Sequence, residues 1–165
     1  MIIIIKKKAS LIFDDFEFKC STGKKGTTYN KIEGDKKTPK GTFNIEDVYF
    51  RPDRIKKPIT KLKCIPLTKK MGWCDDPNDK KNYNRLITIN KNVKKYETLF
   101  RKDYKYDLLI PINYNRKNII LGKGSAIFIH LTKNYKKTLG CVALKKKDLL
   151  ILLKLLKKKN KIKIF

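Results

Sequence analysis

Residues 129–144 read IHLTKNYKKTLGCVAL, and the expected fold rests on this stretch from Ile129 to Leu144. It contains His130, the only histidine of the chain, and Cys141, which follows a glycine. The apolar run Ala126–His130 predicts a strand that ends at the histidine. A polar, basic loop then separates the two residues and can return the chain beside the strand. The stretch therefore predicts that His130 and Cys141 lie close together.

A cysteine beside a histidine is a common arrangement for nucleophilic catalysis. The thiolate is the nucleophile, and a nearby imidazole can lower the pKa of the thiol by several units. Gly140 allows the backbone to approach a substrate closely, and the Cys141 amide can help to bind an oxyanion. The alternative is a hydrogen-bonded strand-end histidine and an inert buried thiol, and the spacing alone does not separate the two.

The charge of the chain is extreme. Its 165 residues carry a formal net charge of +27, and a basic protein is a candidate for binding nucleic acid or another polyanion. Lysines outnumber arginines by 37 to 5, however, and they are spread along the whole sequence. Arginine is the residue that recognises phosphates and bases in a bidentate manner. The composition therefore favours a solvated lysine surface and no specific nucleic-acid partner.

Targeting, membrane and metal signals are weak. The start, MIIIIKKKAS, places isoleucines before lysines, which reverses a signal peptide, and it predicts a first strand instead. No apolar run approaches the ~20 residues that a membrane span needs. The other cysteines, Cys20, Cys64 and Cys74, form no CxxC pair, so neither a zinc site nor a disulfide can be inferred, and no cofactor is expected. Cys20 and Cys64 are expected to be buried, and Cys74 to lie in a polar loop.

The remaining pattern predicts one mainly β domain over residues 1–165. The leucine-rich run Lys147–Leu156 predicts a single main helix after the cysteine, and Lys161–Phe165 alternates as a final strand. Strands are also expected over short segments punctuated by Gly and Pro: Ile2–Ile5, Leu11–Cys20, Thr42–Ile45, Leu62–Leu67, Leu86–Ile89, Tyr106–Ile112 and Ala126–His130.

Several motifs in order resemble the L,D-transpeptidase catalytic domain family (YkuD type). Thr138–Val142 is similar to the family's Ser/Thr-x-Gly-Cys-hydrophobic motif, and Thr38–Phe43 (TPKGTF) to its TPxGxF turn and strand. Gly122–His130 resembles the glycine-led strand that delivers the histidine. Three further segments resemble one branch of the family, and they are YFRPDR at 49–54, GWCDDP at 72–77 with Tyr83-Asn84, and TLGCVAL at 138–144. The resemblance extends from about residue 23 to residue 165.

The resemblance implies an L,D-transpeptidase-like β-sandwich or barrel that acts on peptidoglycan stem peptides. Cys141 would attack the carbonyl carbon of an L,D peptide bond, and His130 would accept the thiol proton. The resulting thioester would pass to an amine of a neighbouring stem. Thr138 and Gly140 would shape the oxyanion site, and a backbone carbonyl would orient the histidine. Many members carry Arg or Asn at the position of Ala143. The motif therefore does not identify the residue that would bind the substrate carboxylate.

The same resemblance suggests a substrate-binding loop at residues 72–84. Asp75 and Asp76 would bind ammonium groups, and an apolar wall would come from Trp73 and Tyr83, with Asn84 beside them. The alternative is a turn capped by Asp before Pro77, with Trp73 in the core. The substrate-carboxylate anchors would be Arg51 and Arg54, which could equally be ordinary surface charges, and Glu33 and Asp35 are expected to be structural. We expect this loop to lie beside the cysteine and histidine.

Three functions remain open from the sequence. They are a transpeptidase with an amine acceptor, an L,D-carboxypeptidase or endopeptidase with water as the acceptor, and a non-catalytic protein that binds polyanions. The resemblance implies a periplasmic or wall-associated place, although no signal peptide is visible at the start of the sequence. The protein is expected to be a monomer.

Overall fold

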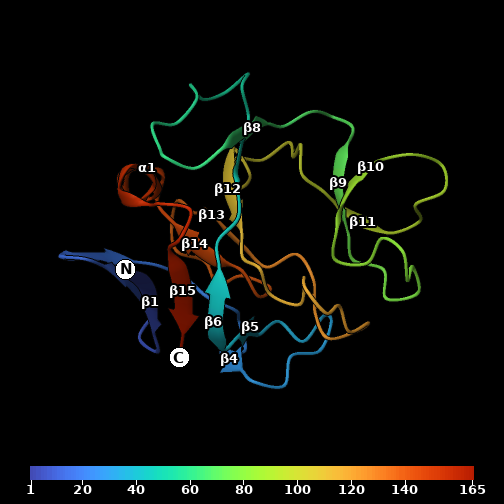
Figure 1. Ribbon diagram of the computed structural model, residues 1–165, viewed down its shortest axis with the longest axis horizontal. Helices are drawn as coiled ribbons and strands as arrows, with labels where there is room; N and C mark the ends of the chain where they lie inside the picture. The colour runs from blue at the N-terminus through green and yellow to red at the C-terminus, as the bar shows by residue number, and fades with distance from the viewer.

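The computed structural model describes all 165 residues and shows a mainly β protein with one helix (Figure 1). The prediction of this fold class is confirmed. The elements, in chain order, are β1 (Ile2–Lys6), β2 (Ser10–Phe13), β3 (Phe16–Lys19), β4 (Thr27–Thr28), β5 (Thr38–Pro39), β6 (Gly41–Asn44), β7 (Val48–Phe50), β8 (Cys64–Pro66), β9 (Met71–Cys74), β10 (Leu86–Thr88), β11 (Tyr96–Thr98), β12 (Leu108–Pro111), β13 (Phe128–Leu131), β14 (Val142–Leu144), α1 (Lys146–Leu155) and β15 (Lys161–Ile164).

Two five-stranded sheets share the main apolar core. The first has the order β3-β2-β1-β15-β6, and the second has the order β14-β13-β12-β7-β8. One cluster of 24 buried residues draws side chains from both sheets and from α1. Neither sheet closes into a barrel, so the sandwich part of the prediction describes the arrangement better than the barrel part.

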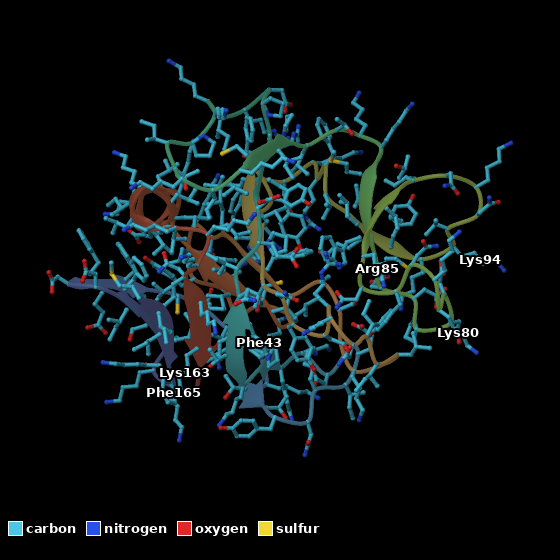
Figure 2. The ribbon with its side chains drawn as sticks, viewed as in Figure 1. Phe43, Lys80, Arg85, Lys94, Lys163 and Phe165 are labelled. Atoms are coloured by element: carbon cyan, nitrogen blue, oxygen red, sulfur yellow. The ribbon has the colours of Figure 1, made fainter.

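The first sheet brings the two ends of the chain together. β1 pairs in parallel with β15, and Ile3 lies opposite Ile162. In β15, Ile162 and Ile164 are buried while Lys161 and Lys163 are exposed. Because side chains alternate between the faces of a strand, the KIKI sequence places its isoleucines in the core and its lysines in water. Figure 2 shows Lys163 at the surface of the molecule, near the end of β15.

Helix α1 covers one end of the core. Its buried residues, Leu149, Leu152 and Leu153, recur at the three- and four-residue spacing that defines one helical face. Asp148 lies in the first turn, where its negative charge interacts favourably with the helix dipole. The helix spans Lys146–Leu155, one residue earlier than the sequence predicts at each end. No helix of the structure combines the length and the apolar character that crossing a membrane requires.

The second sheet is buried on both faces. β12, β13 and β14 have no exposed residue, and residues that face away from the main core join a second cluster of eight buried residues. A three-stranded sheet with the order β10-β9-β11 supplies part of this cluster. Figure 1 shows this small sheet standing to one side of the larger ones. The continuous apolar runs in the second sheet follow from burial on both faces.

The structure corrects four sequence predictions. Leu11–Cys20 is not one strand, because a turn with Asp14 at a φ of 55° folds it into the hairpin β2-β3. Six strands of two to four residues were not predicted, and they are β4, β5, β7, β9, β11 and β14. Cys74 ends strand β9 and is fully buried, so it does not lie in a polar loop. All four cysteines are free, and Cys20 is buried as expected, but Cys64 is only half-buried, so its predicted burial is wrong.

Candidate active site

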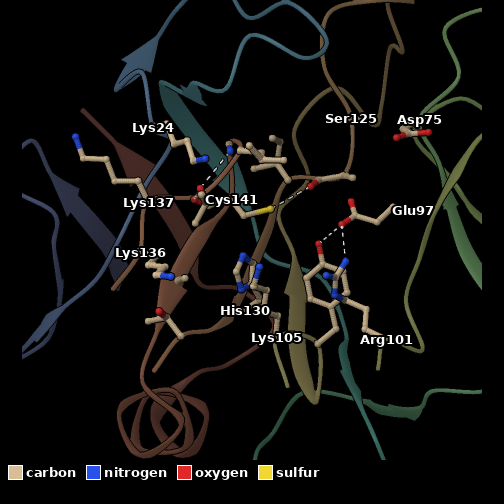
Figure 3. A pocket seen from close by; sticks show the side chains of 18 of the residues that line it. Lys24, Asp75, Glu97, Arg101, Lys105, Ser125, His130, Lys136, Lys137 and Cys141 are labelled. Atoms are coloured by element: carbon tan, nitrogen blue, oxygen red, sulfur yellow. Dashed lines mark hydrogen bonds and ion pairs between the residues drawn. The ribbon is translucent and has the colours of Figure 1, made fainter. Parts of the chain in front are cut away.

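His130 and Cys141 lie on one face of the second sheet. β13 and β14 are parallel neighbours, and His130 lies opposite Ala143. Cys141 comes two residues before Ala143, and side chains two residues apart point to the same face of a strand. The Phe128 N–H donates a hydrogen bond of 3.4 Å to the Cys141 sulfur. The register therefore brings the two side chains together, as Figure 3 shows.

The sulfur of Cys141 is held as a thiol. It donates a hydrogen bond of 3.3 Å to the Ala126 carbonyl oxygen. The pKa of Cys141 is raised to about 12, first because burial removes water from the thiolate and second because of the negative charge of Glu97. The expectation that the imidazole lowers this pKa is therefore wrong for the resting site. The cysteine is protonated and neutral at rest.

His130 is held as a neutral base. Its Nδ1 lies 3.0 Å from the Leu131 carbonyl oxygen, and a carbonyl can only accept a hydrogen bond. Nδ1 therefore carries the hydrogen, and the lone pair of Nε2 stays free. The pKa of His130 is lowered to about 4, mainly because burial disfavours the charged imidazolium, with smaller effects from Lys105 and Arg101. The orienting group that the sequence could not name is the carbonyl of Leu131.

A tight turn presents the Cys141 amide. The Thr138 hydroxyl accepts a hydrogen bond of 3.1 Å from the Gly140 N–H and donates one of 2.6 Å to the Cys141 carbonyl oxygen. Gly140 has a φ of 147°, a conformation that favours glycine. The Cys141 N–H has no hydrogen-bond partner in the protein. The turn thus leaves one backbone N–H free to donate beside the sulfur. This N–H belongs to Cys141 and not to Gly140.

The TPKGTF segment lies beneath this turn, although it is a hundred residues away in sequence. The buried Thr38 hydroxyl accepts a hydrogen bond of 2.8 Å from the Gly23 N–H, and Gly23 pairs with Thr138. A Cβ added to Gly140 would come within 3.1 Å of the Lys37 carbonyl oxygen. The segment therefore supports the backbone that carries Cys141.

The sequence matches one protein family over nearly its whole length. The model of the YkuD family, the L,D-transpeptidase catalytic domain, matches residues 2–164. The chain belongs to the L,D-transpeptidase catalytic domain family. No match was found among curated proteins.

Two solved structures share the fold of this L,D-transpeptidase domain. The helical cell shape determining protein Pgp2 from Campylobacter jejuni is 22% identical, with a TM-score of 0.53. Bd1075 from Bdellovibrio bacteriovorus is 16% identical, with a TM-score of 0.51. The similarity covers 99% of this chain in both cases, but 46% of Pgp2 and 47% of Bd1075. The chain thus spans about half the length of these proteins.

His130 and Cys141 open into a cavity of about 580 Å³ in the domain. Glu33, Asp75 and Glu97 form what we call the acidic wall of this cavity. Figure 3 shows Asp75 and Glu97 across the cavity from Cys141. The opposite side carries lysines that include Lys24, Lys136 and Lys137. The acids are not isolated from cations, because Arg101 lies 3.9 Å from Glu97 and Lys95 also lines the cavity. No group of His, Cys, Asp or Glu side chains is arranged to hold a metal ion.

The two adjacent aspartates of the GWCDDP segment have different surroundings. Asp75 lines the cavity, and its Oδ1 atom is buried without a hydrogen-bond partner. Burial raises the pKa of Asp75, while the positive charge of Lys95 opposes this effect and the negative charge of Glu33 adds to it. Asp76 lies outside the cavity lining, and its Oδ1 accepts a hydrogen bond of 3.0 Å from the Asn78 N–H. Asp76 therefore caps a turn, as in the alternative weighed for the sequence.

Trp73, Tyr83 and Asn84 support the cavity from behind, because all three are buried and absent from its lining. The Trp73 ring packs edge-on against Phe128 at 5.1 Å, and its Nε1–H donates a hydrogen bond of 3.0 Å to Asn84 Oδ1. The Tyr83 hydroxyl donates one of 2.5 Å to Glu33. The expectation that these three residues contact substrate directly is corrected by their burial.

Arg51 and Arg54 are structural cations. The Arg51 guanidinium forms two hydrogen bonds of 2.7 Å to Asp53, and it lies 3.5 Å from the centre of the Phe100 ring. Arg54 pairs with Asp107 at 2.9 Å. Neither arginine lines the cavity. Both guanidinium groups are occupied by these acids and by carbonyl oxygens of residues 101–103, so the expectation that they anchor a substrate carboxylate is corrected.

Sequence reasoning missed Glu33, Glu97 and Tyr106. Glu33, expected to be structural, bridges the hydroxyls of Tyr83 and Ser125 at 2.5 and 2.7 Å. Glu97 accepts a hydrogen bond from the Tyr106 hydroxyl. No motif marks either acid, but a lone glutamate inside the basic run KKYETLF is an unusual feature that could have singled out Glu97.

Proposed function

We propose that this domain is a peptidoglycan L,D-transpeptidase with Cys141 as its nucleophile. The observation that carries the proposal is the shared face of β13 and β14, on which a thiol, a neutral imidazole and an unpartnered Cys141 N–H open into one cavity. The family membership of residues 2–164 supports the same chemistry.

The reaction has two halves. The Cys141 sulfur attacks the carbonyl carbon of an L,D peptide bond while Nε2 of His130 takes the thiol proton. The Cys141 N–H stabilises the oxyanion of the tetrahedral intermediate. The C–N bond then breaks, and His130 returns the proton to the departing amine, which leaves a thioester. An amine of a second stem peptide attacks the thioester, and its proton passes through His130 to the released thiolate.

Burial raises the pKa of Cys141 and lowers that of His130, and we propose that bound substrate helps to activate the pair. The charge of Glu97 raises the pKa of Cys141. An ammonium group bound at the acidic wall would offset that charge and would also supply the missing partner of Asp75 Oδ1. We therefore assign the acidic wall to an ammonium group of the stem peptide. Lys24, Lys136 and Lys137 would hold its carboxylate in place of the arginine or asparagine that Ala143 replaces.

The substrate implies a place of action. Peptidoglycan lies outside the cytoplasmic membrane, and we propose that the protein works there, in the periplasm or at the wall. A structural neighbour, Pgp2, is described as a helical cell shape determining protein. A role in cell shape is proposed here on that basis.

Incubation with purified muropeptides that carry tetrapeptide stems tests the proposal. Mass spectrometry should detect released D-alanine, cross-linked dimers and a thioester on Cys141. Cys141→Ala and His130→Ala should abolish all three products. Cys64→Ser is the matched control, because Cys64 is also half-buried but lies outside the cavity, and its activity should match that of the wild type.

The products separate the alternatives. D-alanine without dimers would assign water as the acceptor and make the domain a carboxypeptidase. Cleavage within cross-linked stems would make it an endopeptidase. A wild-type protein that forms neither product nor thioester would overturn the enzymatic proposal and leave the binding of polyanions as the remaining function.

A further inference from the structure

The ring of Tyr106 packs directly against the ring of His130. Tyr106 lies two residues before β12 and is only 5% exposed. Its ring centre is 5.4 Å from that of His130, with an angle of 67° between the ring planes. It also packs edge-on against Phe128 at 5.7 Å. A histidine that has a backbone carbonyl as its only hydrogen-bond partner depends on such packing to hold its rotamer.

The position of Tyr106 is itself fixed from the cavity side. Its hydroxyl donates a hydrogen bond to Glu97 on β11, and the Arg101 guanidinium lies 5.1 Å from the centre of its ring. The Glu97 carboxylate also lies 3.9 Å from the Arg101 guanidinium, and Figure 3 shows these two residues side by side. Glu97 is thus an anchor for the tyrosine as well as part of the acidic wall.

The backbone ties the same segment to the acceptor of His130. The Leu131 N–H donates a hydrogen bond of 2.9 Å to the Lys105 carbonyl oxygen, and the Leu131 carbonyl oxygen accepts from His130 Nδ1. Lys105, the residue before Tyr106, therefore helps to hold Leu131, whose carbonyl orients the imidazole. Ring packing and backbone bonding act on His130 from two consecutive residues, Lys105 and Tyr106.

We propose that Tyr106 is a positioning residue for His130 and that Glu97 acts through it to keep Nε2 directed at the Cys141 sulfur. This inference rests on the proposed function for its kinetic test only, because the orientation of the imidazole can be measured without substrate. A displacement of about 1 Å in a reacting group can cost roughly 100-fold in rate.

Three variants separate the contributions. Tyr106→Leu removes the ring, Tyr106→Phe keeps the ring and removes the tie to Glu97, and Tyr49→Leu is the matched control. Tyr49 belongs to the same buried cluster and is similarly covered, but its ring has no contact with His130. All three proteins should be checked for folding by circular dichroism and urea unfolding.

Nuclear magnetic resonance of the imidazole gives a direct measurement, because His130 is the only histidine. Charged groups near the ring come from Lys105, Arg101 and Asp103, and all three remain in each variant. In Tyr106→Leu, water should reach the ring, and the titration midpoint of His130 should rise from about 4 toward the ordinary 6.5. Tyr49→Leu should leave the midpoint unchanged despite a similar loss of stability.

Turnover of muropeptides gives the second measurement. We expect Tyr106→Leu to lower kcat roughly 100-fold with little change in KM, and Tyr106→Phe to lower it roughly tenfold, because the error affects the reacting group and not the binding of substrate. Equal effects of Tyr106→Leu and Tyr49→Leu on the His130 titration would overturn the proposal. If Tyr106→Leu does not fold, the test rests on Tyr106→Phe. A kcat and an imidazole spectrum of Tyr106→Phe that both equal those of the wild type would overturn the proposal. If the wild type has no turnover, the proposed function fails and the titration still tests Tyr106.

Discussion

At the scale of single residues, burial sets the chemistry of His130 and Cys141. The imidazole and the thiol lie on the inner side of a sheet that has no exposed residue in β13 or β14. Burial disfavours the charged form of each, which lowers the pKa of His130 and raises that of Cys141. Burial therefore favours the neutral thiol and the neutral imidazole over a thiolate and imidazolium pair.

The lowered pKa of His130 makes a prediction for the stability of the fold. The unfolded chain binds a proton near pH 6.5, but the folded protein does so only near pH 4. Stability from this group is full above pH 6.5 and is lost as the pH falls to 4. His130→Gln lacks the effect. From pH 7 to pH 4, the wild type should lose about 3 kcal/mol more free energy of unfolding than His130→Gln in urea titrations. Parallel curves for the two proteins would contradict the prediction.

Gly140 makes a second prediction at this scale. An alanine there meets both an unfavourable φ of 147° and the Lys37 carbonyl oxygen at 3.1 Å. Gly140→Ala should cost about 1–3 kcal/mol of stability and displace the Cys141 amide, which would slow thioester formation. Gly122→Ala is the control, because Gly122 has a φ of 75° with nothing near its missing Cβ. Equal rates of thioester formation for the two variants would exclude the role of the turn.

At the scale of elements, a buried asparagine joins the small sheet to the loop before β13. Asn84 accepts hydrogen bonds from Trp73 Nε1 and the Ala126 N–H, and its Nδ2 donates to the carbonyls of Tyr114 and Asn115. It adopts a φ of 56°, which asparagine tolerates better than most residues. This set of bonds explains why the residue is buried and why it stands outside the cavity.

Asn84→Ala should therefore be strongly destabilising. Each buried donor left without a partner costs about 1–3 kcal/mol, and the variant leaves two of them on Trp73 and Ala126. We expect a loss of at least about 3 kcal/mol in the free energy of urea unfolding. Asn118→Ala, at an exposed asparagine, should change it by less than about 0.5 kcal/mol. A loss below about 1 kcal/mol in Asn84→Ala would mean that water replaces these bonds.

Helix α1 offers a comparison within one element. Leu152 is fully buried in the main core, while its neighbour Ile151 is 38% exposed. Leu152→Ala should cost about 2–5 kcal/mol, because it removes buried methyl groups and leaves a cavity. Ile151→Ala should cost much less, since that side chain already contacts water. Urea unfolding of the two variants checks the assigned helical face, and equal losses would show that the face is wrong.

At the scale of the whole molecule, the charge of +27 covers the surface rather than forming a single site. Lys80 and Lys94 project from the loops around the small sheet, and Lys163 from the opposite edge (Figure 2). Acids are fewer and gather in small groups, such as Asp53, Asp103 and Asp107 beside arginines, and Glu33, Asp75 and Glu97 in the cavity. The rest of the surface is dominated by lysine.

This distribution predicts nucleic-acid binding that carries no sequence preference. Fluorescence titration with two DNA duplexes of unrelated sequence should give equal affinities. Both affinities should fall roughly 1000-fold between about 50 and 200 mM salt, because many phosphate contacts release counterions. Cys141→Ala should bind equally well. A preference between the duplexes that survives at the higher salt concentration would contradict the prediction and support a nucleic-acid function.

The sequence alone determined the mainly β class, the helix after Cys141 and the approach of His130 to Cys141. These features depend on local patterns, such as KIKI alternation and the leucine spacing of α1, which the fold follows within one or two residues. Motif order determined the family for the same reason, because residues that shape one turn stay close together in the chain.

Only the tertiary structure decided which side chains meet in the cavity and in what state. Glu33, Asp75 and Glu97 come from three separate segments, and Tyr106 reaches His130 from a fourth. Contacts between distant segments leave no periodic signal in the sequence. The pKa values of His130 and Cys141 likewise depend on burial by those segments, because removing water from a charged group is a property of the packed surroundings and not of the residue.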